Sequence, residues 1–340
     1  MKTPRAVCVG EGLVVLVAEP GPLEDSDTFH RMSGGAEANV ASVFAQLGVD
    51  AAWISRVGDD GFGRYLVRQL TAAGVDTSGV AIDDVRPTGM YIKQRGSGSG
   101  TEYDLARGDS AMTYFRAGSA ASALSPTGFD ERASELVSDA DLVHFTGITV
   151  AISNTAADLT RELLGRPAVV SFDLNFRPAL WRSREAEAPE VLGEHVRGSD
   201  VVFMGADEAQ SVFGTSNPDE LRALFPEPRH LVIKNDAHTV TAFEGTARFD
   251  VPALRLDVVE KIGAGDAFAG GYLAGLLWGR GAAERVRFGH LCAAGALTGH
   301  GDIASVLPLD VLVQLAELDD CGWAAVDYAE VSARGSELLQ

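Results

Sequence analysis

The amino-acid sequence predicts an α/β fold, in which a doubly wound, mostly parallel sheet is flanked by helices and a small β-sheet forms a lid. Three features lead to this prediction. Short apolar runs recur along the chain, each followed by a helical pattern, and unbroken apolar runs are typical of buried parallel strands. The predicted helices are followed by glycines. Two segments rich in β-formers and turn residues interrupt the alternation of strands and helices.

The predicted strands of the main sheet lie at 6–9, 51–55, 142–145, 168–172, 201–204 and 231–233. The predicted helices lie at 36–47, 63–73, 154–164 and 206–213, and they are followed by Gly48, Gly74, Gly165 and Gly214. Glycine is common just after a helix because it tolerates the left-handed backbone conformation that ends many helices. Sheets of this kind bind ligands at the carboxyl ends of their strands, so we expect a site there.

The two interrupting segments, 13–32 and 84–116, are expected to pair into the lid, with a flexible tip where the sequence reads Gly-Ser-Gly-Ser-Gly at 96–100. The α/β domain then comprises 1–12, 33–83 and 117–317. Residues 318–340 form a C-terminal extension, part of which we expect to be frayed.

Composition limits the classes of function. The chain has 340 residues, of which 46% are hydrophobic, so it can bury a sizeable core. Its net charge of −20 disfavours nucleic acid and anionic membranes as partners, and an anionic substrate would need local cations. The three cysteines are far apart and form no CxxC motif, which indicates a reducing compartment. Without a signal peptide or an apolar run of about 18 residues, the sequence favours a soluble cytoplasmic protein.

The most informative segment is 258–268. Gly263, Ala264 and Gly265 leave the backbone bare where a helix is expected to begin. Unpaired N–H groups and the positive end of the helix dipole make such a place an anion site. Asp266 lies in this site, where a carboxylate is useful if it takes a proton from a hydroxyl that attacks a phosphate. We therefore predict phosphoryl transfer with Asp266 as the base, and we expect the helix dipole to lower its pKa.

Two other segments carry candidate ligand-binding groups. Gly34 and Gly35 would let a ligand approach the backbone, and Asn39 can hydrogen-bond hydroxyls; the alternative is a tight turn that opens an Ala-rich helix. The second segment holds Asp173, Asn175 and Arg177, which share one face if the chain is extended and follow a strand. The alternative there is a structural ion pair between Asp173 and Arg177.

Further candidates lie in the lid and at two element ends. Tyr91, Tyr114 and Arg116 fall in the predicted lid, where an arginine fork suits a planar carboxylate; the alternative is solvated charge beside ordinary strand aromatics. Lys234 follows a strand and Glu208 starts a helix, so both can approach a nucleotide and its metal, although such residues are common at these positions. His144 has apolar neighbours and is expected to be a buried histidine rather than a metal ligand.

At these residues the chain resembles the ribokinase-like (PfkB) carbohydrate kinases. Gly34-Gly35, Asn39 and Leu47-Gly48 look like the N-terminal motif of that family, residues 263–268 look like its C-terminal motif, and the order of elements matches from about residue 6 to 310. Segments 34–41, 55–60, 87–91, 114–122 and 173–181 are most similar to 2-keto-3-deoxygluconate kinases. The resemblance implies ATP-dependent phosphorylation of the terminal hydroxyl of a sugar acid, 2-keto-3-deoxygluconate, to the 6-phosphate.

The resemblance also implies roles for individual residues. The catalytic set is Asp266 with Gly263, Ala264 and Gly265. The sugar acid would be bound by residues from both domains: Gly34, Gly35, Asn39, Tyr91, Tyr114, Arg116, Asp173, Asn175 and Arg177. ATP would be bound by a third set: Lys234, Glu208, Lys261, Gly263, Gly265 and His290. Mg²⁺ is expected to ride on ATP with few protein ligands, Glu208 contacting it through water.

The sequence departs from the family in four places. Glu260-Lys261-Ile262 stands where the family usually has Asp-Thr-Thr, a stretch that helps many relatives to hold a monovalent cation. Ile262 has no hydroxyl, which leaves activation by a monovalent cation open; our hypothesis is that Lys261 supplies the positive charge. Residues 235–237 replace a glycine-bearing turn after Lys234, and Gly205 replaces a common Asn before Glu208. The lid segment 93–112 is also longer than expected.

Two alternatives stay open at this point. One is a kinase of a neutral sugar, such as fructose or ribose, or of a nucleoside; Arg116 and Arg177 favour the acid. The other is a non-catalytic metabolite-binding protein on the same fold. A lid with exposed sheet edges further suggests a homodimer or a higher homo-oligomer.

Overall fold

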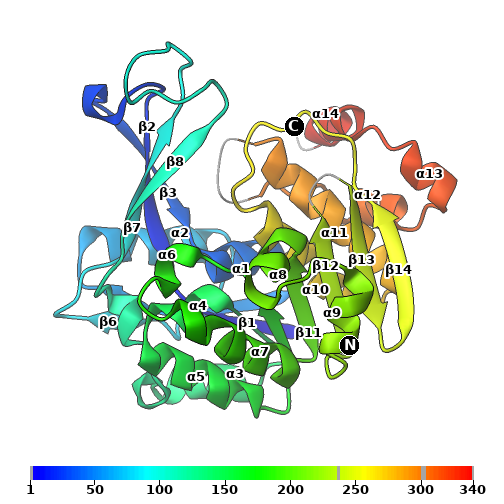
Figure 1. Cartoon of the computed structure of the whole chain (residues 1–340), viewed down its shortest axis with the longest axis horizontal. Coiled ribbons are helices and arrows are strands. Elements are labelled where there is room, and N and C mark those ends of the chain that lie inside the picture. Colours follow the sequence, from blue (N-terminus) through cyan, green and yellow to red (C-terminus); the bar gives the residue numbers. More distant parts are fainter. Residues whose placement is uncertain (1–2, 236–237, 300–303, 339–340) are drawn as a thin grey trace.

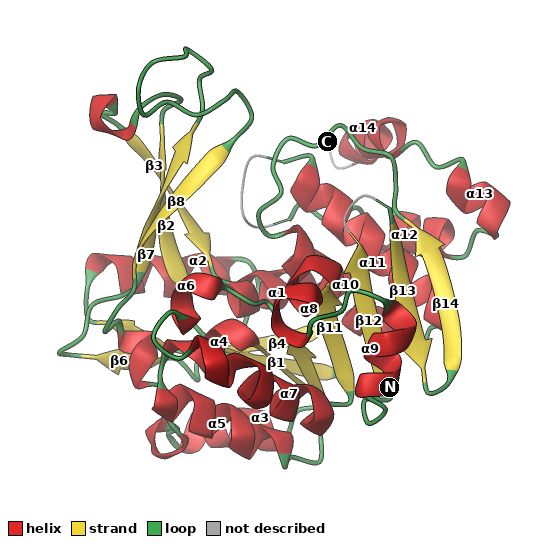
Figure 2. Ribbon diagram, viewed as in Figure 1, coloured by secondary structure: helices red, strands yellow, loops and turns green. Residues whose placement is uncertain are grey.

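An eight-stranded sheet forms the centre of the computed structural model, in the strand order β14-β13-β12-β11-β10-β9-β1-β4 (Figures 1 and 2). The structure describes residues 3–235, 238–299 and 304–338. The strands are β1 (Arg5–Val9), β4 (Asp50–Ile54), β9 (Leu142–Thr146), β10 (Val169–Asp173), β11 (Val201–Gly205), β12 (His230–Asn235), β13 (Thr239–Glu244) and β14 (Ala247–Pro252). The six neighbouring strands β4, β1, β9, β10, β11 and β12 pair in parallel, and β13 and β14 add an antiparallel edge.

This architecture confirms the predicted fold class. Each of the six predicted strands coincides with an observed strand to within two residues at either end. The antiparallel edge was not predicted. Residues 236–237, part of the turn that departs from the family pattern, lie outside the described residues.

Helices cover both faces of the central sheet. One core cluster packs α1 (Ala36–Gln46), α2 (Gly61–Ala72), α10 (Ala264–Leu277), α11 (Ala282–Leu297) and α12 (Leu309–Ala316) on one face. The other packs α3 (Glu131–Ser138), α4 (Gly147–Ile152), α5 (Asn154–Leu164), α6 (Pro178–Trp181), α7 (Ala188–Gly198), α8 (Ala206–Phe213) and α9 (Pro218–Leu224) on the opposite face. Neighbouring strand residues alternate between the clusters, Cys8 facing one and Val9 the other, as the pleat requires.

Three of the four glycines predicted to follow helices adopt the left-handed conformation. The backbone φ is +80° at Gly48, +89° at Gly74 and +80° at Gly214. Gly165 instead has φ −86°, because α5 ends there with a tight turn that any residue can adopt.

A separate four-stranded sheet, called the small sheet below, rises from one end of the body (Figure 1). Its order is β3 (Phe29–Gly34), β2 (Leu13–Ala18), β7 (Met90–Arg95) and β8 (Ser110–Phe115), with β2 and β7 parallel and the other pairs antiparallel. Below it, β5 (Arg56–Gly58) and β6 (Ala81–Asp83) form a two-stranded sheet.

The Gly-Ser stretch between β7 and β8 is held by hydrogen bonds. The Asp104 carboxylate accepts hydrogen bonds from the backbone amides and hydroxyls of Ser97 and Ser99, at 2.7 to 3.0 Å. These bonds hold the pKa of Asp104 well below its usual range. The tip is therefore an organised turn rather than the free linker that its composition suggests.

The C-terminal part adds α13 (Asp320–Ala324) and α14 (Tyr328–Leu338). Trp323 is buried, and its indole N–H donates to the carbonyl of Pro252 at 2.9 Å. Arg287 on α11 donates to Asp320 at 2.7 Å. These contacts fix the beginning of the extension against β14 and α11.

Candidate active site

A cleft of about 350 Å³ opens at the carboxyl ends of the central strands and reaches the small sheet. It is lined by residues from both parts of the molecule: Glu11, Leu13, Gly35, Ala36, Asn39, Tyr91, Met112, Tyr114, Arg116, Ile148, Asp173, Asn175, Arg177, Glu208, Lys234, Lys261, Ile262, Gly263, Gly265 and Asp266. Most of the residues predicted from the sequence thus lie around one space. The location agrees with the general rule for open α/β sheets.

Asp266 lies in the first turn of α10 and lines this cleft. The helix begins after Gly263, whose φ of +79° is the left-handed conformation that glycine favours. Two amides orient the carboxylate: Asn39 Nδ2 donates to Oδ2 at 2.8 Å, and Asn175 Nδ2 donates to Oδ1 at 3.4 Å. The predicted juxtaposition of a carboxylate and a bare helix start is therefore present.

The predicted direction of the Asp266 pKa is wrong. Burial raises the pKa of Asp266 to about 7, and the charge of Asp173 adds to the rise, against the opposing effects of the Asn39 hydrogen bond and the nearby cations Arg177 and Lys234. Removal of the carboxylate from water is a larger effect here than the helix dipole.

The glycine pair before α1 brings the backbone close to the cleft. Gly35 has φ +123°, and a Cβ at this position would lie 2.4 Å from the carbonyl oxygen of Glu11. Gly34 ends β3 but is not among the cleft-lining residues. Both interpretations of the glycine pair therefore hold. The glycines form a tight turn that opens α1, and this turn directs Asn39 of α1 toward Asp266 in the cleft.

The segment after β10 differs from the extended chain that was predicted. The strand ends at Asp173, and Asn175 takes φ +36°, which is unusual for a residue other than glycine. Asp173, Asn175 and Arg177 nevertheless all reach the cleft. The turn, rather than a shared strand face, brings them together.

The alternative ion pair between Asp173 and Arg177 does not form in the described structure, because each has a partner on another strand or helix. Lys234 Nζ contacts Asp173 at 2.8 Å, and Arg177 contacts Glu208 at 3.1 Å. Burial lowers the pKa of Lys234, but Asp173 and Glu208 raise it more, so the ammonium remains charged.

Glu208 is engaged on both carboxylate oxygens. Oε2 accepts the backbone N–H of Gly205 at 3.1 Å, and Oε1 accepts from Arg177. Burial and the charge of Asp173 raise its pKa. The structure shows Glu208 at the cleft as predicted, and its capping bond explains why a Glu at this position is also useful to α8.

Glu11 is a cleft residue that the sequence analysis missed. Its side chain is 1% exposed, pairs with Arg116 and accepts a hydrogen bond from the Ser119 hydroxyl at 2.6 Å. Tyr91 and Tyr114 lie side by side next to this pair, with ring centroids 5.1 Å apart. A carboxylate between two glycines just after β1 was the available signal, but without the fold nothing linked it to Arg116.

Three of the four cations that line the cleft are paired with carboxylates. Arg116 pairs with Glu11, Arg177 with Glu208, and Lys234 with Asp173. Lys261, by contrast, is exposed and has no ion-pair partner among the described residues.

Several buried polar atoms at the cleft lack a partner within the described part of the chain. They are Oδ1 of Asn39, Oδ1 of Asn175 and Nε of Arg116. Unpaired buried polar atoms are costly. Two acceptors and one donor at a cleft suit a ligand that carries both hydroxyl and carboxylate groups.

Three predicted site residues do not line the cleft: Gly34, described above, Ala264 and His290. Glu37 does not line it either. Ala264 starts α10 but does not line the cleft. His290 is buried in the core, with its ring 5.4 Å from that of Phe268 and its Nε2 3.3 Å from the carbonyl of Val251. Glu37, which was not predicted, is fully buried and accepts from Thr146 and Thr149.

His144 is a buried core residue. It is fully buried on β9, and its Nδ1 lies 3.0 Å from the Ser171 hydroxyl. Burial lowers its pKa to about 4, so the ring is neutral. In the described ranges, no group of three or more His, Cys, Asp or Glu residues is placed to hold a metal ion.

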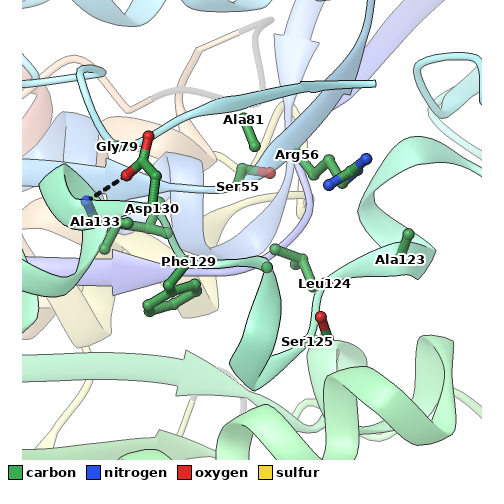
Figure 3. Close-up of a pocket in the computed structure, with 12 residues that line it drawn as sticks. Ser55, Arg56, Gly79, Ala81, Ala123, Leu124, Ser125, Phe129, Asp130 and Ala133 are labelled. Carbon is green, nitrogen blue, oxygen red and sulfur yellow. Dashed lines mark hydrogen bonds between the residues drawn. The ribbon is translucent and has the colours of Figure 1, made fainter. Parts of the chain in front are cut away.

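A second pocket, of about 10 Å³, lies beside α3 (Figure 3). Ser55, Arg56, Leu124 and Phe129 are among its lining residues, and Asp130 caps α3 by accepting the Ala133 N–H at 2.8 Å. This volume suits about one water molecule.

No helix in the described part of the chain is long and apolar enough to span a membrane.

Comparison with known proteins adds independent information. The model of the pfkB family of carbohydrate kinases matches residues 4–309, a range that includes every cleft residue. The chain is 37% identical over 271 residues to a protein of Thermoproteus tenax named 2-dehydro-3-deoxygluconokinase, a match that covers 79% of this chain and 80% of the relative.

Solved structures give the same picture. The 2-dehydro-3-deoxygluconokinase of Thermotoga maritima matches with a TM-score of 0.81 at 25% identity, covering 93% of this chain and 99% of that one. An uncharacterized sugar kinase of Pyrococcus horikoshii in complex with ATP matches with a TM-score of 0.76 at 25% identity, covering 95% and 100%.

Proposed function

Since the chain belongs to the pfkB family of carbohydrate kinases and is an ATP-dependent sugar kinase, we propose that its substrate is a sugar acid, 2-keto-3-deoxygluconate (also written 2-dehydro-3-deoxygluconate), which it converts to the 6-phosphate. The observation that carries this proposal is the cleft that joins Asp266 to two arginines. Arg116 and Arg177 line the same space as Asp266, so a substrate with a carboxylate at one end and a hydroxyl at the other can contact both groups.

In this proposal the substrate carboxylate binds at the Arg116 end, beside Tyr91 and Tyr114. Nε of Arg116 is buried without a partner in the described residues and is available as a donor. The unpartnered Oδ1 atoms of Asn39 and Asn175 accept hydrogen bonds from sugar hydroxyls. The terminal hydroxyl then lies next to Asp266.

Asp266 accepts the proton of that hydroxyl as the oxygen attacks the γ-phosphate of ATP in line. The backbone N–H groups of residues 263–266 stabilise the negative charge that the transferring phosphoryl group carries. Lys234, Lys261 and Glu208 line the cleft, and in this proposal the nucleotide phosphates with their Mg²⁺ bind beside them. Phosphoryl transfer depends on such positioning and charge stabilisation more than on covalent chemistry of the protein.

Segments 13–32 and 84–116 act as a lid in this proposal. Tyr91, Met112 and Tyr114 of the small sheet line the cleft, so the sheet covers a bound sugar acid. Exclusion of water prevents transfer of the phosphoryl group to water. Exposed Phe29 and Phe115 on the same sheet support a homodimer or higher homo-oligomer, which light scattering after size exclusion measures.

A neutral-sugar kinase is the second candidate, and one observation favours it. Glu11 neutralises Arg116 before any ligand arrives, so the lid end of the cleft carries no net charge from this pair. The deciding experiment measures ADP formation with ATP and a panel of 2-keto-3-deoxygluconate, its C4 epimer, fructose and ribose. A higher kcat/KM for either sugar acid than for both neutral sugars supports the proposal. The reverse order rejects it in favour of the second candidate, and no turnover on any of the sugars rejects both.

A further inference from the structure

One ion pair joins the small sheet to the segment that leads into the Asp266 loop. Lys93 on β7 pairs with Glu260, and their side chains are 2% and 14% exposed. Lys93 lies two residues after Tyr91 on the same strand, so both side chains point to the same face of the small sheet. One face of the small sheet therefore contacts two places: Tyr91 lines the cleft, and Lys93 contacts Glu260 in the 258–262 segment.

Glu260 also shapes the segment that enters α10. Its Oε1 accepts the backbone N–H groups of Lys261 and Ile262 at 3.0 and 3.4 Å, while Oε2 contacts Lys93. The backbone N–H groups of Val259 and Glu260 donate to the carbonyl of Leu297 at 2.8 and 3.2 Å. The segment is therefore anchored to the end of α11 on one side and to the small sheet on the other.

Because the Lys93 side chain is buried, separating it from Glu260 costs free energy. An ammonium group removed from water is costly unless a carboxylate faces it. If the small sheet moves away from the body, or if the turn at 260–262 rearranges, Lys93 loses its partner. The position of the small sheet and the shape of the loop before Gly263 are therefore energetically coupled.

We propose that Lys93 and Glu260 are positioning residues for phosphoryl transfer. They fix the small sheet, which carries Tyr91 and Tyr114 against the sugar, relative to the loop that carries Asp266 and the phosphate-binding amides. This inference rests on the proposed kinase reaction, but not on which sugar is the acceptor. The coupling predicts that loss of the pair impairs alignment of acceptor and phosphate and admits water.

The chain offers variants that isolate the pair. Lys93→Met keeps an unbranched side chain one atom shorter than that of lysine and removes the charge. Glu260→Gln keeps an oxygen that can accept the amides of Lys261 and Ile262, so it removes the ion pair with little change to the turn. The matched control is Arg95→Met, because Arg95 lies on the same strand and bonds only within the small sheet region in the described structure, to Glu19 at 3.9 Å and to the carbonyl of Ala18 at 3.2 Å.

The experiment measures kcat/KM with the best acceptor of the wild-type protein, and the ratio of ADP formed to sugar phosphate formed. We expect each single variant to lose about tenfold in kcat/KM and to give a ratio above that of the wild type, whereas Arg95→Met changes kcat/KM by less than about twofold. The double variant Lys93→Met with Glu260→Gln is expected to lose no more than either single variant, since both remove one interaction.

Three outcomes overturn the inference: wild-type rates and ratios in both single variants, losses that multiply in the double variant, or an equal effect of Arg95→Met. If a single variant does not fold, the double variant is used instead, because it leaves neither charge buried without a partner. Its amide hydrogen exchange is then compared with that of the wild type. Faster exchange of amides in both β7 and 258–263 supports the coupling, and unchanged exchange in either segment contradicts it. Because the acceptor is whichever sugar the wild type uses, failure of the sugar-acid proposal appears in the wild type and failure of this inference only in the variants.

Discussion

The role of Asp266 is tested most directly by replacing it with Asn, which has nearly the same shape and cannot accept a proton. The side-chain amides of Asn39 and Asn175 donate hydrogen bonds to the Asp266 carboxylate at 2.8 and 3.4 Å. An Asn at position 266 keeps one side-chain oxygen, Oδ1, that can accept such a bond. We expect kcat to fall by roughly 10²–10⁴, the usual contribution of a positioned base. KM for the sugar should change much less, because the binding groups remain.

The same residue predicts the pH dependence of the reaction. With a pKa of about 7, Asp266 is ionised above neutral pH and protonated below it. At pH 6 roughly a tenth of the molecules carry the base form, so kcat/KM should be about tenfold below its plateau and should rise with pH until about 7 to 8. Removal of the Asn39 hydrogen bond, which lowers this pKa, should move the midpoint of the profile in Asn39→Leu to higher pH.

The assay is the initial rate of ADP formation at saturating ATP between pH 5.5 and 8.5, with sugar concentration varied at each pH. A profile for the wild type that is flat over this range would refute the raised pKa. A kcat for Asp266→Asn within about tenfold of wild type would refute the role of the base itself.

Stability gives a second readout of the same pKa. The folded-state pKa of Asp266 is above the model-peptide value of about 3.9. The native state therefore binds this proton more tightly than the unfolded state, and the contribution of Asp266 to stability falls as pH rises from about 4 to about 7. Asp266→Asn should consequently have a higher Tm than the wild type at pH 8, and the difference should shrink toward pH 5. An equal Tm difference at both pH values would contradict burial as the cause.

Three further changes have defined outcomes. Arg116→Ala should raise KM for the sugar acid roughly tenfold or more and leave KM for fructose nearly unchanged; steady-state kinetics with both sugars checks this, and an equal loss for both contradicts carboxylate binding. Omission of K⁺ should alter the rate by less than about twofold if Lys261 supplies the local positive charge, and strong K⁺ dependence in a K⁺/choline comparison counts against it. Gly35→Ala should lower the free energy of unfolding by at least ~1–3 kcal/mol, because its Cβ would meet the Glu11 carbonyl; Gly61→Ala, at an open position with ordinary φ, is the control in urea denaturation.

The parts of the site that could be predicted are those that depend on residues close together in the sequence. Asp266 after two glycines at a helix start, and Asn39 at the start of an Ala-rich helix, are local patterns, and both residues lie in the cleft. The partners of Asp173 and Arg177 were not predictable in the same way. Lys234 is 61 positions from Asp173, and only the order of strands in the sheet brings it beside that carboxylate. Glu11 was missed for the same reason, since its partner Arg116 lies on the connection after β8.

The direction of the Asp266 pKa shows why local chemistry is not enough. A helix N-terminus is worth about 0.3–1 kcal/mol to a carboxylate, which is less than one pKa unit, whereas loss of hydration can shift the pKa of a carboxyl group by several units, up to ~3–5 when it is fully buried. The first effect depends on residues next to Asp266 in the chain, and the second depends on how deep the cleft is and on Asp173 across it. The larger effect decides, so the fold makes Asp266 a stronger base than its position on the helix predicts. A base whose pKa lies near 7 combines a substantial ionised fraction at neutral pH with enough affinity for a proton to take it from the attacking hydroxyl.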